Sequence, residues 1–167
     1  TPSNPPIPGN PTLEVVDSTS DLTPPSLSSV TLSSSRVDVS AAPQEVTLRV
    51  AASDPGSGID PQSVKFNVNA PRWCETSIPD PNSPGVIAYC TGSLEPGAQV
   101  NAQGFVTQGV WDVTLLVPRW ITSFSFAPLA GAEMTDAAGN PIHYGDQGST
   151  PSNPPIPGNP TLEVVDS

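Results

Sequence analysis

Positive charge is scarce in this sequence. Its 167 residues include 16 acidic side chains against five basic ones, and Lys65 is the only lysine, which leaves a formal net charge of −11. Binding to nucleic acid depends on a positively charged surface, so the composition argues against a DNA- or RNA-binding protein. An acidic surface of this kind is compatible with cation binding or with solubility in salt.

Long apolar runs are absent as well. No stretch of about 18 consecutive apolar residues occurs, so the sequence predicts no membrane insertion. The chain begins neither with methionine nor with a basic and apolar leader, and we therefore expect it to be an internal piece of a longer protein. The length fits a single domain.

Recognisable catalytic motifs are missing. His143 is the only histidine, and residues 55–59, "PGSGI", do not match the G-x-S-x-G pattern of a nucleophile elbow. There is no glycine-rich loop of the kind that holds a phosphate. We therefore expect no enzymatic activity.

Cysteine is limited to two residues, Cys74 and Cys90, each next to an aromatic residue. The segment between them is rich in proline, serine and asparagine, which is typical of a loop joining two strands. Such a loop would place the thiols opposite each other, so we predict a disulfide and hence an oxidising compartment. Two buried free thiols are the alternative, whereas a metal site would need more ligands than two cysteines and one histidine.

The sequence does contain a long duplication. Residues 1–18, "TPSNPPIPGNPTLEVVDS", return without change as residues 150–167. A fold does not require identity over eighteen residues, so the duplication indicates recently copied units. A fragment that holds one period of 149 residues and a short overlap would have this pattern, and we predict a tandem array.

Alternating apolar residues predict an all-β protein. The segments with a period of two are residues 45–53, 63–70, 109–118, 123–129 and 161–167. Clusters of proline and glycine separate them, and 23 prolines disfavour helices. Short strands at this spacing favour a β-sandwich. Residues 148–160 predict an extended, polyproline-like connector that leads flexibly into the last strand.

Several of these segments resemble a known family. Residues 21–60 contain "DLTPP", "VDVS" and "DPGSGID", and "GVWDVTLLVPRW" and "MTDAAGNPIHY" follow later. These motifs are similar to those of a bacterial immunoglobulin-like repeat of large secreted and surface proteins of the adhesin type. The resemblance covers Asp21 to Tyr144 and implies an immunoglobulin-like antiparallel β-sandwich with Pro-rich connectors. The cysteine-bracketed insertion after Trp73 and the long connector depart from the family pattern.

The resemblance also sets the boundaries of the unit. Residues 21–167 form one repeat, with 148–160 as the connector to the closing strand, and residues 1–20 are the tail of the preceding repeat. Two identical segments, Thr12–Ser18 and Thr161–Ser167, then compete for one closing position. Only Thr19 and Ser20 separate the first copy from Asp21, so we expect the second copy to close the sandwich. The first copy would be a spare strand able to add to the edge of another molecule.

In such a sandwich, oxygen-bearing side chains gather at the pole where the first strand begins. The residues expected there are Asp21, Asp54, Ser57, Asp60, Asp136 and Asn140, together with Asp17 of the preceding unit. Side-chain oxygens in this number suit a calcium ion, which takes six to eight oxygen ligands. The alternative is that these residues only form Asx turns and shape the loops.

Three tryptophans complete the candidate residues. Trp111 lies in an alternating segment and is predicted to be in the core. Trp73 and Trp120 each follow an arginine near a loop and could contact a glycan, although packing or covering a loop is the alternative.

These features together favour a structural module of an extracellular or cell-surface bacterial protein, which extends the array and sets its stiffness. Its partners would be the neighbouring repeats and, through the parent protein, a cell-surface or glycan target. The alternative function is an adhesive or carbohydrate-binding module of the same kind of protein.

Overall fold

The computed structural model describes residues 4–5, 7–9, 11, 21–69, 74, 77–82, 87–119, 122–145 and 153–167. These residues form strands and one short 3-10 turn, η1 (Pro61–Ser63). The strands are β1 (Ser26–Leu32), β2 (Arg36–Asp38), β3 (Gln44–Ser53), β4 (Lys65–Val68), β5 (Ser77–Pro79), β6 (Ile87–Cys90), β7 (Ser93–Leu94), β8 (Gln99–Val100), β9 (Val106–Val117), β10 (Phe124–Phe126), β11 (Leu129–Thr135), β12 (Pro141–Gly145) and β13 (Leu162–Val165). The prediction of an all-β fold is confirmed.

Two larger sheets pack face to face. The first has the order β1-β3-β9-β7, with β8 paired to β9, and the second has the order β12-β11-β4-β6-β5. Alternation along β3 turns Leu48 and Val50 inwards, and β4 contributes Phe66 in the same way. These side chains meet in one buried cluster around Trp111, which confirms the predicted core position of that tryptophan. The molecule is therefore a β-sandwich with one principal core.

A third, smaller sheet closes one end of the sandwich. It has the order β10-β13-β2, and β13 pairs antiparallel with β10 but parallel with β2. The expectation of an antiparallel sandwich thus holds for every described strand pair except β2–β13. The sheet covers a second buried cluster: Val37, Val39, Val46, Val117, Leu162 and Val164. The expectation that the C-terminal copy of the duplicated segment closes the sandwich is confirmed.

The described part of the connector is packed against the sandwich. Ile156 is only 8% exposed and belongs to the principal core, and the Pro154 carbonyl accepts a hydrogen bond of 2.9 Å from the Gly145 backbone N–H. Gly145 has a φ of 78°, and a Cβ there would collide with the Ala130 carbonyl. Residues 153–160 form neither helix nor strand, as predicted, but the expectation of a flexible tether is wrong for them because Ile156 is anchored in the core.

One predicted strand ends earlier than its alternation. The period of two runs from residue 123 to 129, but β10 stops at Phe126 and Leu129 begins β11 in another sheet. Pro128 lies between them and has no backbone N–H to donate to a ladder. Its carbonyl instead accepts a 2.8 Å hydrogen bond from the Asn69 backbone N–H. The chain therefore uses this proline to pass from the small sheet to the second large sheet.

The predicted disulfide between Cys74 and Cys90 is confirmed. Cys90 ends β6 in the second large sheet, where it pairs with Phe66. Cys74 makes an isolated bridge to Leu115 of β9, in the first large sheet. Both cysteines are buried in the principal core. The disulfide thus links the two large sheets of the sandwich.

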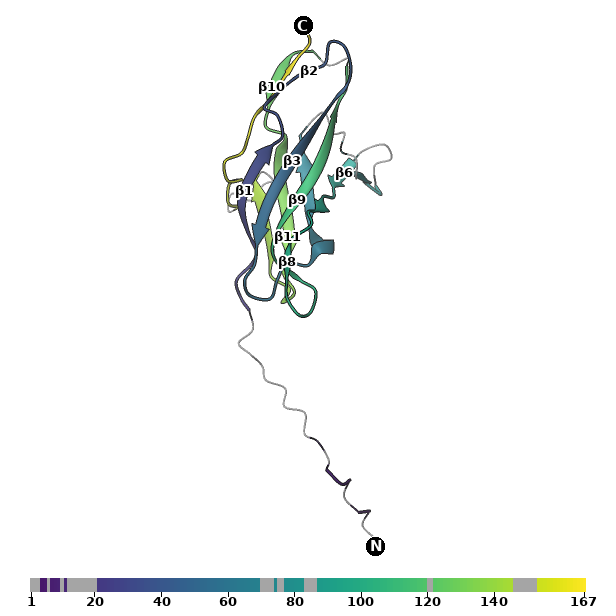
Figure 1. The fold of residues 1–167 in the computed structure, drawn as a ribbon, viewed down its shortest axis with the longest axis vertical. Helices are drawn as coiled ribbons and strands as arrows, with labels where there is room; N and C mark the ends of the chain where they lie inside the picture. The colour runs from purple at the N-terminus through teal and green to yellow at the C-terminus, as the bar shows by residue number, and fades with distance from the viewer. Residues whose placement is uncertain are drawn as a thin grey trace.

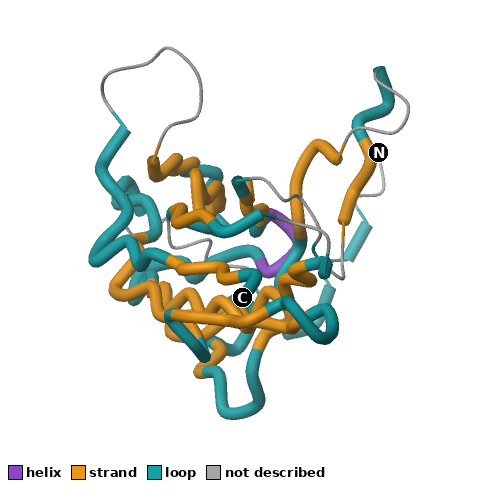
Figure 2. The backbone as a smooth tube through the Cα atoms, turned by 90° about the horizontal axis from the view of Figure 1, so that it is seen from above, coloured by secondary structure: helices purple, strands orange, loops and turns teal. Residues whose placement is uncertain are grey.

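The sandwich is elongated, and different loops and strands lie at its two ends (Figure 1). We call the end where β3 finishes and β11 turns into β12 the acidic pole; Asp21, where the continuously described chain begins, lies there. We call the other end, where β3 begins beside β2 and β13, the C-terminal pole. Figure 2 views the molecule along this axis, with η1 in purple. No helix in the described ranges is long and apolar enough to cross a bilayer.

Candidate metal centre

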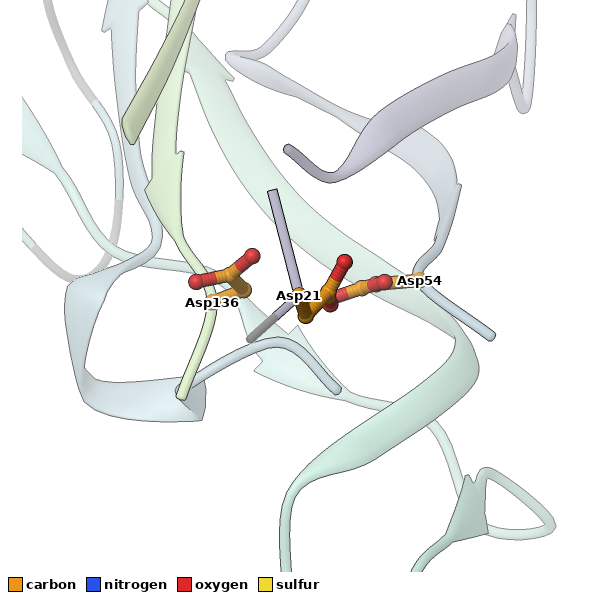
Figure 3. A group of neighbouring side chains, drawn as sticks. All are labelled: Asp21, Asp54 and Asp136. Atoms are coloured by element: carbon orange, nitrogen blue, oxygen red, sulfur yellow. The ribbon is translucent and has the colours of Figure 1, made fainter. Parts of the chain in front are cut away.

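Three carboxylates from distant parts of the chain converge at the acidic pole (Figure 3). Asp21 precedes β1, Asp54 directly follows β3, and Asp136 directly follows β11. One ligand oxygen of each lies within 4.8 Å of the others. Because β3 and β11 belong to facing sheets and both end at this pole, packing of the sandwich brings the three together.

The loop after β3 is shaped by Asp54. Its two carboxylate oxygens accept hydrogen bonds from the backbone N–H groups of Gly56, at 3.0 Å, and Gly58, at 3.1 Å. The bond from Gly56 forms the Asx turn that the sequence predicts as the alternative role for such residues, and the bond from Gly58 closes the rest of the loop. The turn holds the Asp54 side chain inside the loop, where it is 1% exposed.

Asp21 is fixed by the same loop. One of its oxygens accepts a 2.8 Å hydrogen bond from the Ser57 N–H, and the other accepts one of 3.0 Å from the Thr23 N–H. Gly56 leaves the room that this carboxylate occupies, since a Cβ at Gly56 would collide with the Asp21 carboxylate. The sequence analysis did not single out Gly56, although its place in "DPGSG" is typical of a close approach of the backbone.

Asp136 is held through Asn140. The backbone N–H and the side-chain amide of Asn140 each donate a 2.7 Å hydrogen bond to Asp136, which is 3% exposed. The same amide also donates to the Asp21 backbone carbonyl at 2.7 Å. Asn140 therefore joins the β11–β12 turn to the segment that precedes β1.

The charges in this group are not compensated by a basic side chain. Among the described residues, no ion pair involves Asp21, Asp54 or Asp136. Burial, and to a smaller degree the neighbouring carboxylates, raises the pKa of Asp54, while hydrogen bonds from Ser57 and Thr23 lower the pKa of Asp21. The surroundings thus favour the ionised form of Asp21 and oppose ionisation of Asp54.

This arrangement has the donor chemistry of a hard-cation site. Each carboxylate oxygen that accepts one hydrogen bond keeps a further lone pair. Three carboxylates with oxygen donors only match what calcium prefers, and a divalent ion would compensate the buried charge. The hydrogen bonds of the three carboxylates also shape the surrounding turns. The geometry therefore fits both roles expected from the sequence: binding a cation and forming Asx turns.

The other expected ligands have different positions. Ser57 lies beside the three carboxylates. Its N–H donates a hydrogen bond to Asp21, and its hydroxyl accepts one of 3.3 Å from the Ala138 N–H. Asp60 lies at the same pole, where its carboxylate accepts from the Gln62 N–H and caps η1 instead of joining the group of three.

Two sets of sequence expectations cannot be placed. Trp73 and Trp120, the candidate glycan contacts, lie outside the described residues, and so does Asp17.

Comparisons of the chain with protein-family models, with curated proteins and with solved structures found no match.

Proposed function

We propose that this chain is one immunoglobulin-like unit of a tandem array in a secreted or surface-attached bacterial protein, and that it extends the array and sets its stiffness. The observation that carries the proposal is the placement of the two ends of the unit. Asp21 lies at the acidic pole and Ser167 at the C-terminal pole, on opposite ends of the long axis (Figure 1). Because its two ends lie at opposite poles, each unit would add the full length of its long axis to the array.

The duplicated segment supports serial joining. Its docked copy ends at Ser167, and in the other copy the same last residue, Ser18, is followed by Thr19, Ser20 and then Asp21. Consecutive units would therefore meet through two residues, with the acidic pole of one unit against the C-terminal pole of the unit before it. So short a linker restricts the hinge between units.

Calcium is the proposed ligand at that junction. Asp21 is both the first residue after the linker and a member of the carboxylate cluster, so an ion bound there would tie the linker to Asp54 and Asp136. The proposal assigns no catalytic role to the unit. A disulfide in the core supports a location outside the cytoplasm.

Calcium is expected to raise the melting temperature of the chain. At free calcium of about 100 times the dissociation constant, binding to the folded state contributes about 2.7 kcal/mol, or roughly 5–10 °C for a chain of this length. Differential scanning calorimetry with calcium chloride and with a chelator measures the shift. An unchanged melting temperature at millimolar calcium would contradict the metal site but not the role as an extender.

Two variants define the site in that experiment. Gly56→Ala places a methyl group against the Asp21 carboxylate and should abolish most of the calcium shift by displacing that ligand. Asp80→Asn is the matched control, because Asp80 also accepts an Asx-turn hydrogen bond, from the Asn82 N–H, but lies outside the cluster. It should leave the calcium shift unchanged.

The stability of the protein should depend on pH differently with calcium and with a chelator. Because burial raises the pKa of Asp54 above its ordinary value of 3.8, the calcium-free protein loses stability from this carboxyl as the pH rises through the folded-state pKa. The calcium shift should instead grow over the same pH range, because protons and calcium compete for the carboxylate.

A chain of two consecutive units tests the extender role itself. Small-angle X-ray scattering should give a maximum dimension close to twice that of one unit, because the linker joins opposite poles. The same measurement with a chelator should show a broader distribution of distances if calcium restrains the hinge. Two units packed side by side would contradict the proposal.

A further inference from the structure

The position filled by β13 is a slot that another copy of the same segment fits. β13 lies between β10 and β2, and its Leu162 and Val164 are almost fully buried in the second cluster. Upstream, Ile156 of the same segment fills a site in the principal core. The slot accepts Leu162, Val164 and the two hydrogen-bonding edges of β13, and the neighbouring site in the principal core accepts Ile156. All of these groups are supplied by the segment 150–167.

Residues 1–18 carry the same side chains in the same order. Ile7, Leu13 and Val15 correspond to Ile156, Leu162 and Val164. The two isoleucines have opposite environments, since Ile7 is 69% exposed and Ile156 is 8% exposed. The other described residues of the first copy are exposed as well. The described residues of the first copy are thus exposed, and the structure contains a fitted site for the same sequence.

The first copy cannot reach the slot of its own chain. In the docked copy, the Val165 carbonyl accepts a hydrogen bond from the Val39 N–H at the C-terminal pole. Val16 would take that place, and only five residues later Asp21 must lie at the acidic pole. Five residues span at most about 18 Å, whereas the ten-residue strand β3 between the poles is about 33 Å long. Docking of the first copy is therefore possible only on another molecule.

We infer that the slot between β10 and β2 is an interaction site for residues 1–18 of a second copy of this chain. The donor segment replaces β13 and runs parallel to β2, and the donor's acidic pole then follows at the acceptor's C-terminal pole. The contact is heterologous, so it propagates head to tail and does not stop at a dimer. The inference rests on the duplicated segment and the filled slot, and does not depend on the proposed function.

Competition with the resident segment sets the amount of association. The two segments make identical contacts, but β13 is tethered to its own slot and acts at a high effective concentration. Wild-type chains should therefore exchange slowly and associate little when dilute. Weakening β13 alone should shift the balance toward the segment from the second molecule.

The same substitution, made in either copy of the duplicated segment, tests whether the two copies compete for the slot. Leu162→Asp puts a charge on the resident strand, and Leu13→Asp puts it at the corresponding position of the donor. In sedimentation velocity, Leu162→Asp should form species of two or more chain masses that increase with concentration. Leu13→Asp should remain monomeric, and the double variant should also be monomeric and should melt at the lowest temperature. Association of the double variant, or a monomeric Leu162→Asp chain at high concentration, would overturn the inference.

A cross-link detects the contact without disturbing the core. Ser125 lies directly opposite Glu163 in the β10–β13 pair, and Glu14 is the matching residue of the donor. Under mild oxidation, Glu14→Cys/Ser125→Cys should give a ladder of disulfide-linked chains on a non-reducing gel. The control Glu163→Cys/Ser125→Cys should give an internal bridge in the monomer. If the control bridges and the first variant gives no ladder, the donor does not enter the slot.

Discussion

Removing residues 150–167 is expected to unfold the dilute chain, whereas removing residues 1–18, the same amino acids, is expected to leave its melting temperature almost unchanged. The docked segment buries Ile156, Leu162 and Val164, which are 8%, 0% and 1% exposed. Burial of aliphatic side chains contributes about 1.5–3 kcal/mol each, so the loss is of order 5–9 kcal/mol. A typical domain has only about 5–15 kcal/mol of stability in total.

The loss is not confined to the segment that is removed. Without β13, the second cluster exposes Val37, Val39 and Val46 to water, and β2 and β10 lose their only hydrogen-bonded partner in the described structure. Thermal melts followed by circular dichroism at low protein concentration measure the difference between the two deletions. Equal destabilisation by both deletions would show that residues 1–18 belong to the fold, and that the boundary of the unit is not at Asp21.

The Cys74→Ala/Cys90→Ala variant is expected to lose about 3 kcal/mol of stability, which corresponds to roughly 6–12 °C in melting temperature for a chain of this length. The bond closes a loop across a sequence separation of 16 and so restricts the unfolded chain. It also joins Cys74, bridged to β9 of the first sheet, to Cys90 of β6 in the second. Urea unfolding followed by tryptophan fluorescence measures the change.

Reduction of the native protein is the control for the two alanines. The reduced wild-type chain should unfold at nearly the same urea concentration as the double variant, because both lack the cross-link and keep the rest of the core. If the double variant were as stable as the oxidised protein, the loop would be held by its other contacts alone, and the bond would add nothing.

Alternation along the chain predicted five of the thirteen described strands: β3, β4, β9, β10 and β13. Alternation in "EVTLRVAAS" places Val46, Leu48 and Val50 on one face, and those side chains are buried in β3. β11 and β12 were not predicted, because "LAGAEMT" is rich in alanine and glycine, and Pro141 begins the next strand. Their strand conformation comes from pairing with each other and with β4, which neighbouring residues alone do not encode.

The carboxylate cluster was only partly predictable. The spacing of loops in a sandwich indicated that Asp21, Asp54 and Asp136 share one pole, and the structure brings them together. Their burial, the opposite shifts in the pKa values of Asp54 and Asp21, and the space left by Gly56 depend on how the loops pack. The sequence likewise could not separate Asp60 from the group, because the role of Asp60 as the cap of η1 depends on the local backbone.

The duplicated segment separates the two kinds of information most clearly. By itself, the sequence determined the composition of that segment, its connector and strand character, and, through the two-residue link to Asp21, which copy closes the sandwich. Only the tertiary structure decided that Ile156 is a core residue while Ile7 is exposed, although both stand in the same eighteen-residue context. The physical reason is chain connectivity. Residues 150–167 follow β12 and can lie along the sandwich into the slot. In the first copy, Val16 is only five residues from Asp21 at the opposite pole, and that length is too short for the first copy to occupy the slot of its own chain.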